Sequence, residues 1–226
     1  QINKIDPLNF GETIWVIKPE DLSNIGAFFR TGIFSSSRTV AISGDSLKSP
    51  KYYSTIIGAS ISSLINSDEI NDINNYRFIN GDPLSGLKVE YSEFLGFYNN
   101  SLSVIEEGNN YRMLGWLPFM YNSIPSFSKT SFSWLLGGAK KVNTNLNGEE
   151  RAIVVTGEME KYFPMDIFPM QLIKACMRGD IEKMESLGIY EVVPEDFGLV
   201  DFSCTSKIEA QEIIKNGIEI MLKEVG

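Results

Sequence analysis

The sequence predicts a multidomain chain of mixed fold class, with an α/β start and α+β architecture after it. Three observations predict this. Residues 13–43 have the order strand, helix, strand; residues 45–117 hold many short strands separated by turns; residues 149–226 are mostly helical. Strand, helix, strand is typical of a parallel α/β unit, and short strands around one short helix are typical of a β-grasp domain.

The first elements are a strand expected over Thr13–Ile17 and a helix expected over Pro19–Arg30. Proline in the first turn and two acidic residues behind it favour the positive start of a helix. The second strand, Arg38–Ser43, is rich in β-branched residues and ends at Gly44. Because polar and turn residues precede the first strand and no initiator Met is present, we expect the chain to begin in the middle of a domain.

The middle of the chain is expected to alternate strands with turns. A strand is predicted over Tyr52–Ile57 and a short helix over Ser60–Asn66. The glycine-rich stretch Gly81–Gly86 favours a β-turn over the alternative of a loop that holds an anion through its backbone. Further short strands are predicted over Tyr76–Ile79, Phe94–Phe97, Leu102–Ile105 and Arg112–Trp116.

The last third is predicted to be helical after one short strand at Ala152–Thr156. A helix is expected from about Pro169, where its missing N–H is harmless, to Gly179. A short helix should follow Asp180. The spacing of Ser206 and Glu209 matches a capping box, which predicts that a final helix begins there and runs to about Lys223.

The composition limits the classes of function. The 226 residues are 43% hydrophobic, which is enough for a core, and the net charge is −9. Residues 149–226 hold 16 acidic and 8 basic residues, a net charge of −8, so the acidity belongs to the last third. A nucleic-acid surface needs clustered positive charge, so we expect no nucleic-acid partner. No apolar run is long enough for a membrane span.

The residues that carry chemistry are few. The chain has no histidine and two cysteines, Cys176 and Cys204, which indicates a reducing compartment and argues against a zinc or iron–sulfur site. Cys204 precedes a predicted helix, where a thiolate would be stabilised, but a structural role is favoured. The pair Glu195 and Asp196 suits capping or solvation better than acid–base catalysis. We therefore predict no catalytic, cofactor-binding or metal-ligating residue.

An ordered set of stretches goes further than any single motif. They are Ile25–Gly44, Leu95–Gly108, Leu114–Trp116, Asn147–Asp180, Gly179–Cys204 and Lys223–Gly226. In this order they resemble the NqrA family, the A subunits of the bacterial Na+-translocating NADH:quinone reductase (Na+-NQR), over the C-terminal half of that family. More distantly they are similar to the RnfC component of the Rnf complex and to the flavin-bearing component of complex I.

The resemblance implies a domain organisation and a set of motif positions. Residues 1–44 would end a Rossmann-like domain, 45–117 would form a β-grasp domain of the soluble-ligand-binding (SLBB) kind, 118–148 would connect, and 149–226 would form a helical domain. The family tends to show Cys-Pro-Gly-Lys where this chain has Cys204-Thr205-Ser206-Lys207. Structural or interface roles are implied for Gly32, Arg38, Gly44, Gly96, Gly115, Trp116, Gly157, Asp166, Pro169, Glu195, Asp196 and Cys204.

The resemblance also implies a function. The chain would be part of a peripheral component on the cytoplasmic side of the bacterial inner membrane, docked chiefly on membrane-embedded subunits of the reductase. The complex would use NADH, flavins, an iron–sulfur centre, quinone and Na+, none of them bound by this chain except as a candidate contact for ubiquinone or menaquinone. A stand-alone β-grasp module that binds a small ligand through Gly81–Gly86, Tyr91, Phe94 and Tyr98 is the alternative, and a soluble enzyme is the least favoured.

Overall fold

The computed structural model describes residues 4–65, 70, 72–108, 110, 124–126, 134–135 and 141–224. They divide into two compact units. The sheet unit comprises the described residues of 12–82 and 86–104, and the helical unit those of 1–11, 83–85 and 105–226. The chain is therefore a mixed α/β fold with one sheet and several helices.

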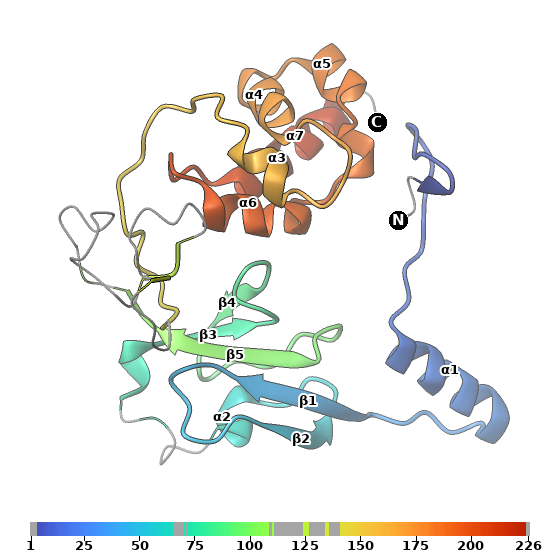
Figure 1. Ribbon diagram of the computed structural model, residues 1–226. Helices are drawn as coiled ribbons and strands as arrows, with labels where there is room; N and C mark the ends of the chain where they lie inside the picture. Colours follow the sequence, from blue (N-terminus) through green and yellow to red (C-terminus); the bar gives the residue numbers. More distant parts are fainter. Residues whose placement is uncertain are drawn as a thin grey trace. The chain divides into compact units, whose positions relative to one another are not determined.

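The sheet unit is built on five strands in the spatial order β2-β1-β5-β3-β4 (Figure 1). β1 pairs antiparallel with β2 and parallel with β5, and β3 pairs antiparallel with β4. The helix α1 precedes β1, and two short helices, α2 and η3, lie between β2 and β3 in the chain. The bounds are α1 Pro19–Thr31, β1 Ser37–Ser43, β2 Lys51–Ile56, α2 Ile61–Leu64, η3 Ile73–Asn75, β3 Tyr76–Asn80, β4 Leu87–Val89 and β5 Ser101–Glu106.

The core of the sheet unit follows from the alternation of side chains along a strand. In β1, Arg38, Val40 and Ile42 are buried while their neighbours in the strand are exposed or partly exposed. β5 is buried from Leu102 to Ile105, as expected for a strand with neighbours on both edges. The predicted strands at 38–43, 52–57, 76–79 and 102–105 and the predicted helices at 19–30 and 60–66 are thus confirmed, with small shifts at their ends.

The helical unit packs short helices around a core of its own (Figure 1). α4 begins at Pro169 and ends at Gly179, whose left-handed backbone lets its N–H reach the carbonyl oxygens of Ala175 and Cys176. This confirms the predicted helix. The bounds are α3 Glu158–Tyr162, α4 Pro169–Arg178, α5 Ile181–Ser186, η4 Ile189–Glu191, η5 Pro194–Phe197, α6 Gly198–Ser203 and α7 Ala210–Glu224.

Three predicted strands are wrong. Residues 13–17 and 152–156 lie outside any helix or strand, and within 94–97 only Phe94 forms an isolated bridge, with Ser60. A strand needs a neighbouring backbone to satisfy its N–H and C=O groups, and residues 13–17 leave their apolar side chains in solvent, with Trp15 88% exposed. The β-branched composition of these stretches favours an extended backbone, but it does not provide a strand for them to pair with. The predicted strand at 112–116 lies outside the described residues.

The predicted capping box before α7 is also wrong. The Ser206 hydroxyl donates to the carbonyl oxygen of Ala152. The start of α7 is instead capped by the Asp201 carboxylate, which accepts from the backbone N–H groups of Ala210 at 2.5 Å and Gln211 at 3.3 Å. Asp201, which lies in the preceding helix α6, therefore has the capping role that was predicted for Ser206. The helix α7 begins at Ala210.

The first strand-helix-strand unit does not form as predicted, because its first strand is missing and β1 joins the five-stranded sheet. The expected domain boundary at residue 44 falls between β1 and β2, which pair along six residue pairs from Ser37 with Ile56 to Ile42 with Lys51. None of the helices in the described part of the chain is long and apolar enough to span a membrane.

Candidate functional site

A buried arginine organises the sheet unit at the start of β1. Arg38 occupies an inward position of the strand and is only 3% exposed. One terminal nitrogen donates to the carbonyl oxygen of Phe97 at 2.7 Å and to the side-chain oxygen of Asn100 at 3.0 Å. The other forms an ion pair with Asp21 at 2.5 Å. A buried charge is tolerated only when it is paired and hydrogen-bonded, and Arg38 meets both conditions.

The partners of Arg38 connect α1 to the loop before β5. The side-chain amide of Asn100 donates to Glu20, and the Lys18 ammonium donates to the carbonyl oxygen of Tyr98. Glu20 and Asp21 lie in the first turn of α1, where the positive end of the helix favours carboxylates. We call Lys18, Glu20, Asp21, Arg38 and Asn100 the α1 latch.

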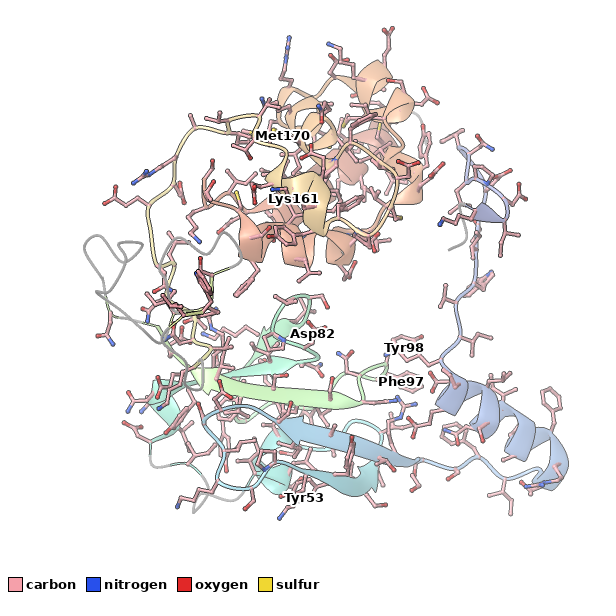
Figure 2. The ribbon with its side chains drawn as sticks, viewed as in Figure 1. Tyr53, Asp82, Phe97, Tyr98, Lys161 and Met170 are labelled. Carbon is pink, nitrogen blue, oxygen red and sulfur yellow. The ribbon has the colours of Figure 1, made fainter. Side chains whose placement is uncertain are left out.

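Aromatic and apolar side chains surround the latch. The Arg38 guanidinium lies 5.9 Å from the centre of the Phe97 ring, and Phe97 contacts Tyr98 edge to face with 5.0 Å between the ring centres. Figure 2 shows Phe97 and Tyr98 at the end of the sheet beside the first turn of α1. Both rings are more than half exposed, so they offer a surface for contact as well as packing against the latch.

An open groove of about 540 Å³ lies where the chain passes from α1 into β1. Hydroxyl groups of serine and threonine lie between apolar side chains along it. Its lining is Ile33, Phe34, Ser35, Ser36, Ser37, Ser54, Thr55 and Ile56. Such a surface can hydrogen-bond and bury apolar groups at once, but it holds no charged side chain.

Three glycines of the implied motif set have local reasons in the sheet unit. Gly32 ends α1 with a left-handed backbone, and its N–H donates to the Phe28 carbonyl oxygen at 2.8 Å. A Cβ atom at Gly44 would lie 1.8 Å from the carbonyl oxygen of Val104, and one at Gly96 would lie 2.6 Å from the Asn80 side chain. Gly44 thus lets two backbones approach closely, Gly96 leaves room for the Asn80 side chain, and Gly32 supplies the left-handed backbone that ends α1.

The residues of the implied motif set that lie in the helical unit are spread along the chain. Each has its own local role. Gly157 precedes α3 with a left-handed backbone, and Pro169 is the buried first residue of α4. The Asp196 carboxylate accepts from the N–H of Val193 at 3.0 Å, which confirms the capping role. Asp166 and Glu195 are at least partly exposed. Gly115 and Trp116 lie outside the described residues.

Both cysteines are buried as free thiols. Cys204 follows α6 and is 4% exposed, so the structure places it in the core of the helical unit. Burial raises the pKa of the Cys176 thiol to about 11. A thiol that stays protonated at neutral pH is a poor nucleophile and a poor metal ligand. Among the described residues, no group of three or more cysteine, aspartate or glutamate side chains could hold a metal ion.

The alternative ligand site around Gly81–Gly86 is not assembled as predicted. The stretch is a turn between β3 and β4, in which the Gly86 N–H donates to the Asp82 carbonyl oxygen at 2.9 Å. The Tyr91 hydroxyl donates to the Ile65 carbonyl oxygen, and its ring packs against Phe78. Tyr91 therefore packs against the core. The stretch turns as predicted, but its hydrogen bond joins residues four apart, as in an α-turn, where a β-turn would join residues three apart.

Sequence reasoning selected Arg38 but missed its partners Glu20, Asp21 and Asn100 as a site. The alternation in Arg38-Thr39-Val40-Ala41-Ile42 was a usable signal, because it places an arginine on the same face as Val40 and Ile42. A charge on the buried face of a strand requires a counter-charge. The sequence does not show which carboxylate supplies this counter-charge, because the partners lie far from Arg38 along the chain.

Comparison with known proteins first identifies the class of domain to which part of the sheet unit is similar. Residues 39–91, which include most of β1 and all of β2, β3 and β4, match the family model described as the NQRA C-terminal domain. This part of the sheet unit is therefore similar to the C-terminal domain of NQRA proteins.

The relatives extend the resemblance to nearly the whole chain. NqrA, the A component of the Na(+)-translocating NADH-quinone reductase, from Neisseria meningitidis serogroup C is 34% identical over 224 residues, 99% of this chain and 50% of the relative. NqrA from Rhodopirellula baltica is 33% identical over 99% of this chain and 49% of the relative, and that from Pasteurella multocida 34% over 99% and 50%. The chain spans about half the length of these relatives, and the predicted resemblance to NqrA is confirmed.

Proposed function

We propose that this chain is part of the NqrA component of a Na+-pumping NADH:quinone reductase and serves as a docking module of that complex. The observation that carries the proposal is the similarity to NqrA along 99% of the chain. NADH oxidation, quinone reduction and Na+ export would then be activities of the assembled complex. Flavins, an iron–sulfur centre and the Na+ path would belong to partner subunits.

The proposed position is peripheral, on the cytoplasmic side of the bacterial inner membrane, with the membrane-embedded subunits as the main partners. Two surface features support docking. The first is the set of exposed apolar side chains around α1, among them Trp15, Phe29 and Phe34. The second is the net charge of −8 on residues 149–226, which suits a basic partner surface.

The domain assignment that accompanies this function is also a proposal. The segment that ends with α1 would complete a Rossmann-like domain, in place of the predicted 1–44, because β1 belongs to the sheet. The five-stranded sheet would be the SLBB β-grasp domain, in place of 45–117, and residues 149–226 the helical domain. The similarity to NqrA along 99% of the chain supports this assignment. A quinone would contact this chain at exposed aromatic side chains, for which Phe97 and Tyr98 are the candidates.

The experiment is reconstitution with membranes. The tagged 226-residue chain is incubated with detergent-solubilised membranes of a bacterium that has the reductase but lacks its own NqrA. We expect the chain to retain the other reductase subunits, detected by mass spectrometry. Membranes from a strain without the whole reductase are the control. Equal retention from both membranes, or none from the membranes that hold the reductase, would contradict the proposal.

A matched pair of variants tests which surface docks. Replacing Trp15 and Phe29 by alanine removes two exposed apolar side chains, one before α1 and one within it, and should weaken retention at least about tenfold, as loss of interface anchors does. Leu87→Ala removes an exposed apolar side chain from β4, which lies at an edge of the described sheet, and should leave retention unchanged. Equal effects of both would place the docking surface elsewhere.

A second candidate function is a stand-alone module that binds a small ligand. The groove between Ile33 and Ile56 favours it, since hydroxyl groups and apolar side chains lie together along its lining. Saturable binding of a solute, lost on Ser54→Tyr and without retention of reductase subunits, would favour this function over docking.

A further inference from the structure

The helix α1 is attached to the sheet unit by its polar side. Its amphipathic stripe comprises Leu22, Ile25, Phe28 and Phe29, and all four are exposed. None of the 13 residues of α1 is buried. Helices in globular proteins usually dock through the apolar stripe, so this attachment is inverted.

The contacts that hold α1 are those of the α1 latch. They come from its N-terminal end: Lys18 bonds to the Tyr98 carbonyl oxygen, Glu20 to Asn100, and Asp21 to Arg38. On the sheet side they reach two places: residues 97–100, to which Arg38 also donates, and the start of β1, where Arg38 itself lies and the Thr39 N–H donates to Glu20 at 3.5 Å. The first turn of α1 is thus attached to the start of β1 and to residues 97–100, and its later turns are not.

The ion pair is the dominant contact. Arg38 is 3% exposed and the Asp21 side chain 22%, so the pair is largely removed from water and weakly screened. Removal of one partner of a buried pair leaves an uncompensated charge and is strongly unfavourable. Lys18 makes one hydrogen bond, and Glu20 accepts two, from the Asn100 amide and, at a long 3.5 Å, from the Thr39 N–H. Whether α1 stays attached therefore depends on the Asp21–Arg38 pair.

The helix itself has little stability to contribute. Isolated helices of this length are marginal in water, and Gly26 in the interior weakens this one further. Without a buried side chain, α1 gains order only from its caps and from the latch. Loss of the latch should therefore release the helix and also disorder it.

We propose that the α1 latch is a conformational switch with two states. In the latched state Arg38 holds α1 against residues 97–100 and fixes the direction of its apolar stripe. In the released state α1 and the connection 32–36 move together, and the groove lined by Ile33 to Ser37 loses one wall. Arg38 is the positioning residue of this device, and the sheet keeps its fold in both states.

Amide hydrogen exchange of the 226-residue chain tests the switch. Peptides covering 19–31 report α1, and peptides covering 101–106 report the sheet. Asp21→Asn keeps the size of the side chain and removes the charge. We expect it to speed exchange in α1 at least about tenfold, because a charge-assisted hydrogen bond to a buried group is lost. Exchange in β5 should stay within about twofold.

Two further variants keep the test decisive. Arg38→Met in the Asp21→Asn background replaces the buried charge by an apolar side chain of similar length, which such sites accept. Fast α1 exchange with a protected β5 is expected there too, and separates release from unfolding of the sheet. Arg30→Gln removes a charge from the last turn of α1, away from the latch, where a cation favours the helix by about 0.3–1 kcal/mol. It should therefore speed α1 exchange by no more than about fivefold, less than Asp21→Asn does.

Two results would overturn the proposal. The first is α1 exchange that is unaltered by Asp21→Asn and by the double variant. The second is equal acceleration of α1 and β5 in both, which would make the ion pair a general support of the sheet and leave no separate released state.

Discussion

At the scale of single residues, Gly44 is where one added methyl group would meet the backbone of β5. Its φ of +141° is a conformation that side chains avoid, and the new Cβ would lie 1.8 Å from a backbone oxygen. We expect Gly44→Ala to lower the free energy of unfolding of the sheet unit by about 3 kcal/mol or more. Urea unfolding followed by circular dichroism measures it.

Gly26→Ala is the matched control for that substitution. Gly26 lies inside α1, and a Cβ atom there would meet nothing within 4 Å. Alanine should stabilise the helix by about 0.5–1 kcal/mol. Losses of similar size at Gly26 and Gly44 would show that glycine replacement as such is harmful, and that the close approach at Gly44 is not the cause.

The sequence could identify Gly44 and Arg38 as positions of interest but could not give their physical role. A glycine after a strand is equally compatible with a plain turn and with a close backbone approach. The distinction depends on Val104, far along the chain, which no local pattern connects to Gly44. Gly217 was not selected at all, although a glycine among apolar residues of a helix indicates a tight contact between helices.

At the scale of elements, α4 and α7 meet at Gly217 and Cys176. A Cβ atom at Gly217 would lie 2.5 Å from the Cys176 sulfur. Gly217→Ala should destabilise the helical unit by about 1–3 kcal/mol through overpacking. In a Cys176→Ala background the sulfur is gone, so the same substitution should cost less than about 1 kcal/mol. A double-mutant cycle by chemical denaturation measures the coupling, and strict additivity would contradict this packing.

The cap of α7 gives a prediction with a pH dependence. Burial raises the pKa of the Asp201 carboxyl above its ordinary value of 3.8, although hydrogen bonds from Gln211 and Ala210 oppose the rise. Asp201→Ala should lose about 1–2 kcal/mol at neutral pH, as removal of an N-terminal cap does.

The sign of the pH effect follows from linkage. Because folding raises this pKa, the contribution of the carboxyl to stability is greatest below pH 3.8 and falls as the pH rises through the folded pKa. The stability difference between the native chain and Asp201→Ala should therefore be larger at about pH 4 than at about pH 7. Paired denaturation curves at the two pH values test this, and a larger difference at neutral pH would refute it.

Helices could be located from the sequence more accurately than strands, for a physical reason. α4 is bounded by Pro169 and Gly179, whose backbone preferences act locally and need no partner. The stretches at 13–17 and 152–156 have the composition of strands but lack a paired neighbour in the described structure. Likewise the cap of α7 comes from Asp201, nine residues before the N–H of Ala210 and beyond the reach of the capping-box pattern.

At the scale of the whole molecule, most of the described core residues fall into two clusters with no member in common. Both cysteines belong to the helical cluster, and the sheet cluster has none. The thiols therefore report on the helical unit alone. We expect them to be unreactive toward a disulfide reagent at about pH 8 in the native chain, since both are buried.

Urea separates the two units through the same thiols. In Gly44→Ala the thiols should stay protected at urea concentrations that already unfold the sheet, whereas Gly217→Ala should expose them at lower urea than in the native chain. Simultaneous loss of sheet signal and thiol protection in every variant would mean that the clusters unfold as one cooperative body.

The parallel pairing of β1 with β5 also affects how the protein reaches its fold. Ala41 pairs with Ser101, so the central strands meet only after all of β2, β3 and β4 have been synthesised. Non-local pairing of this kind slows folding relative to helices that contact near neighbours in the chain. During refolding from denaturant the sheet unit should lag behind the helical unit, with unpaired strands in solvent. Recovery of the native fold should therefore fall as the protein concentration rises, unless refolding is carried out at high dilution.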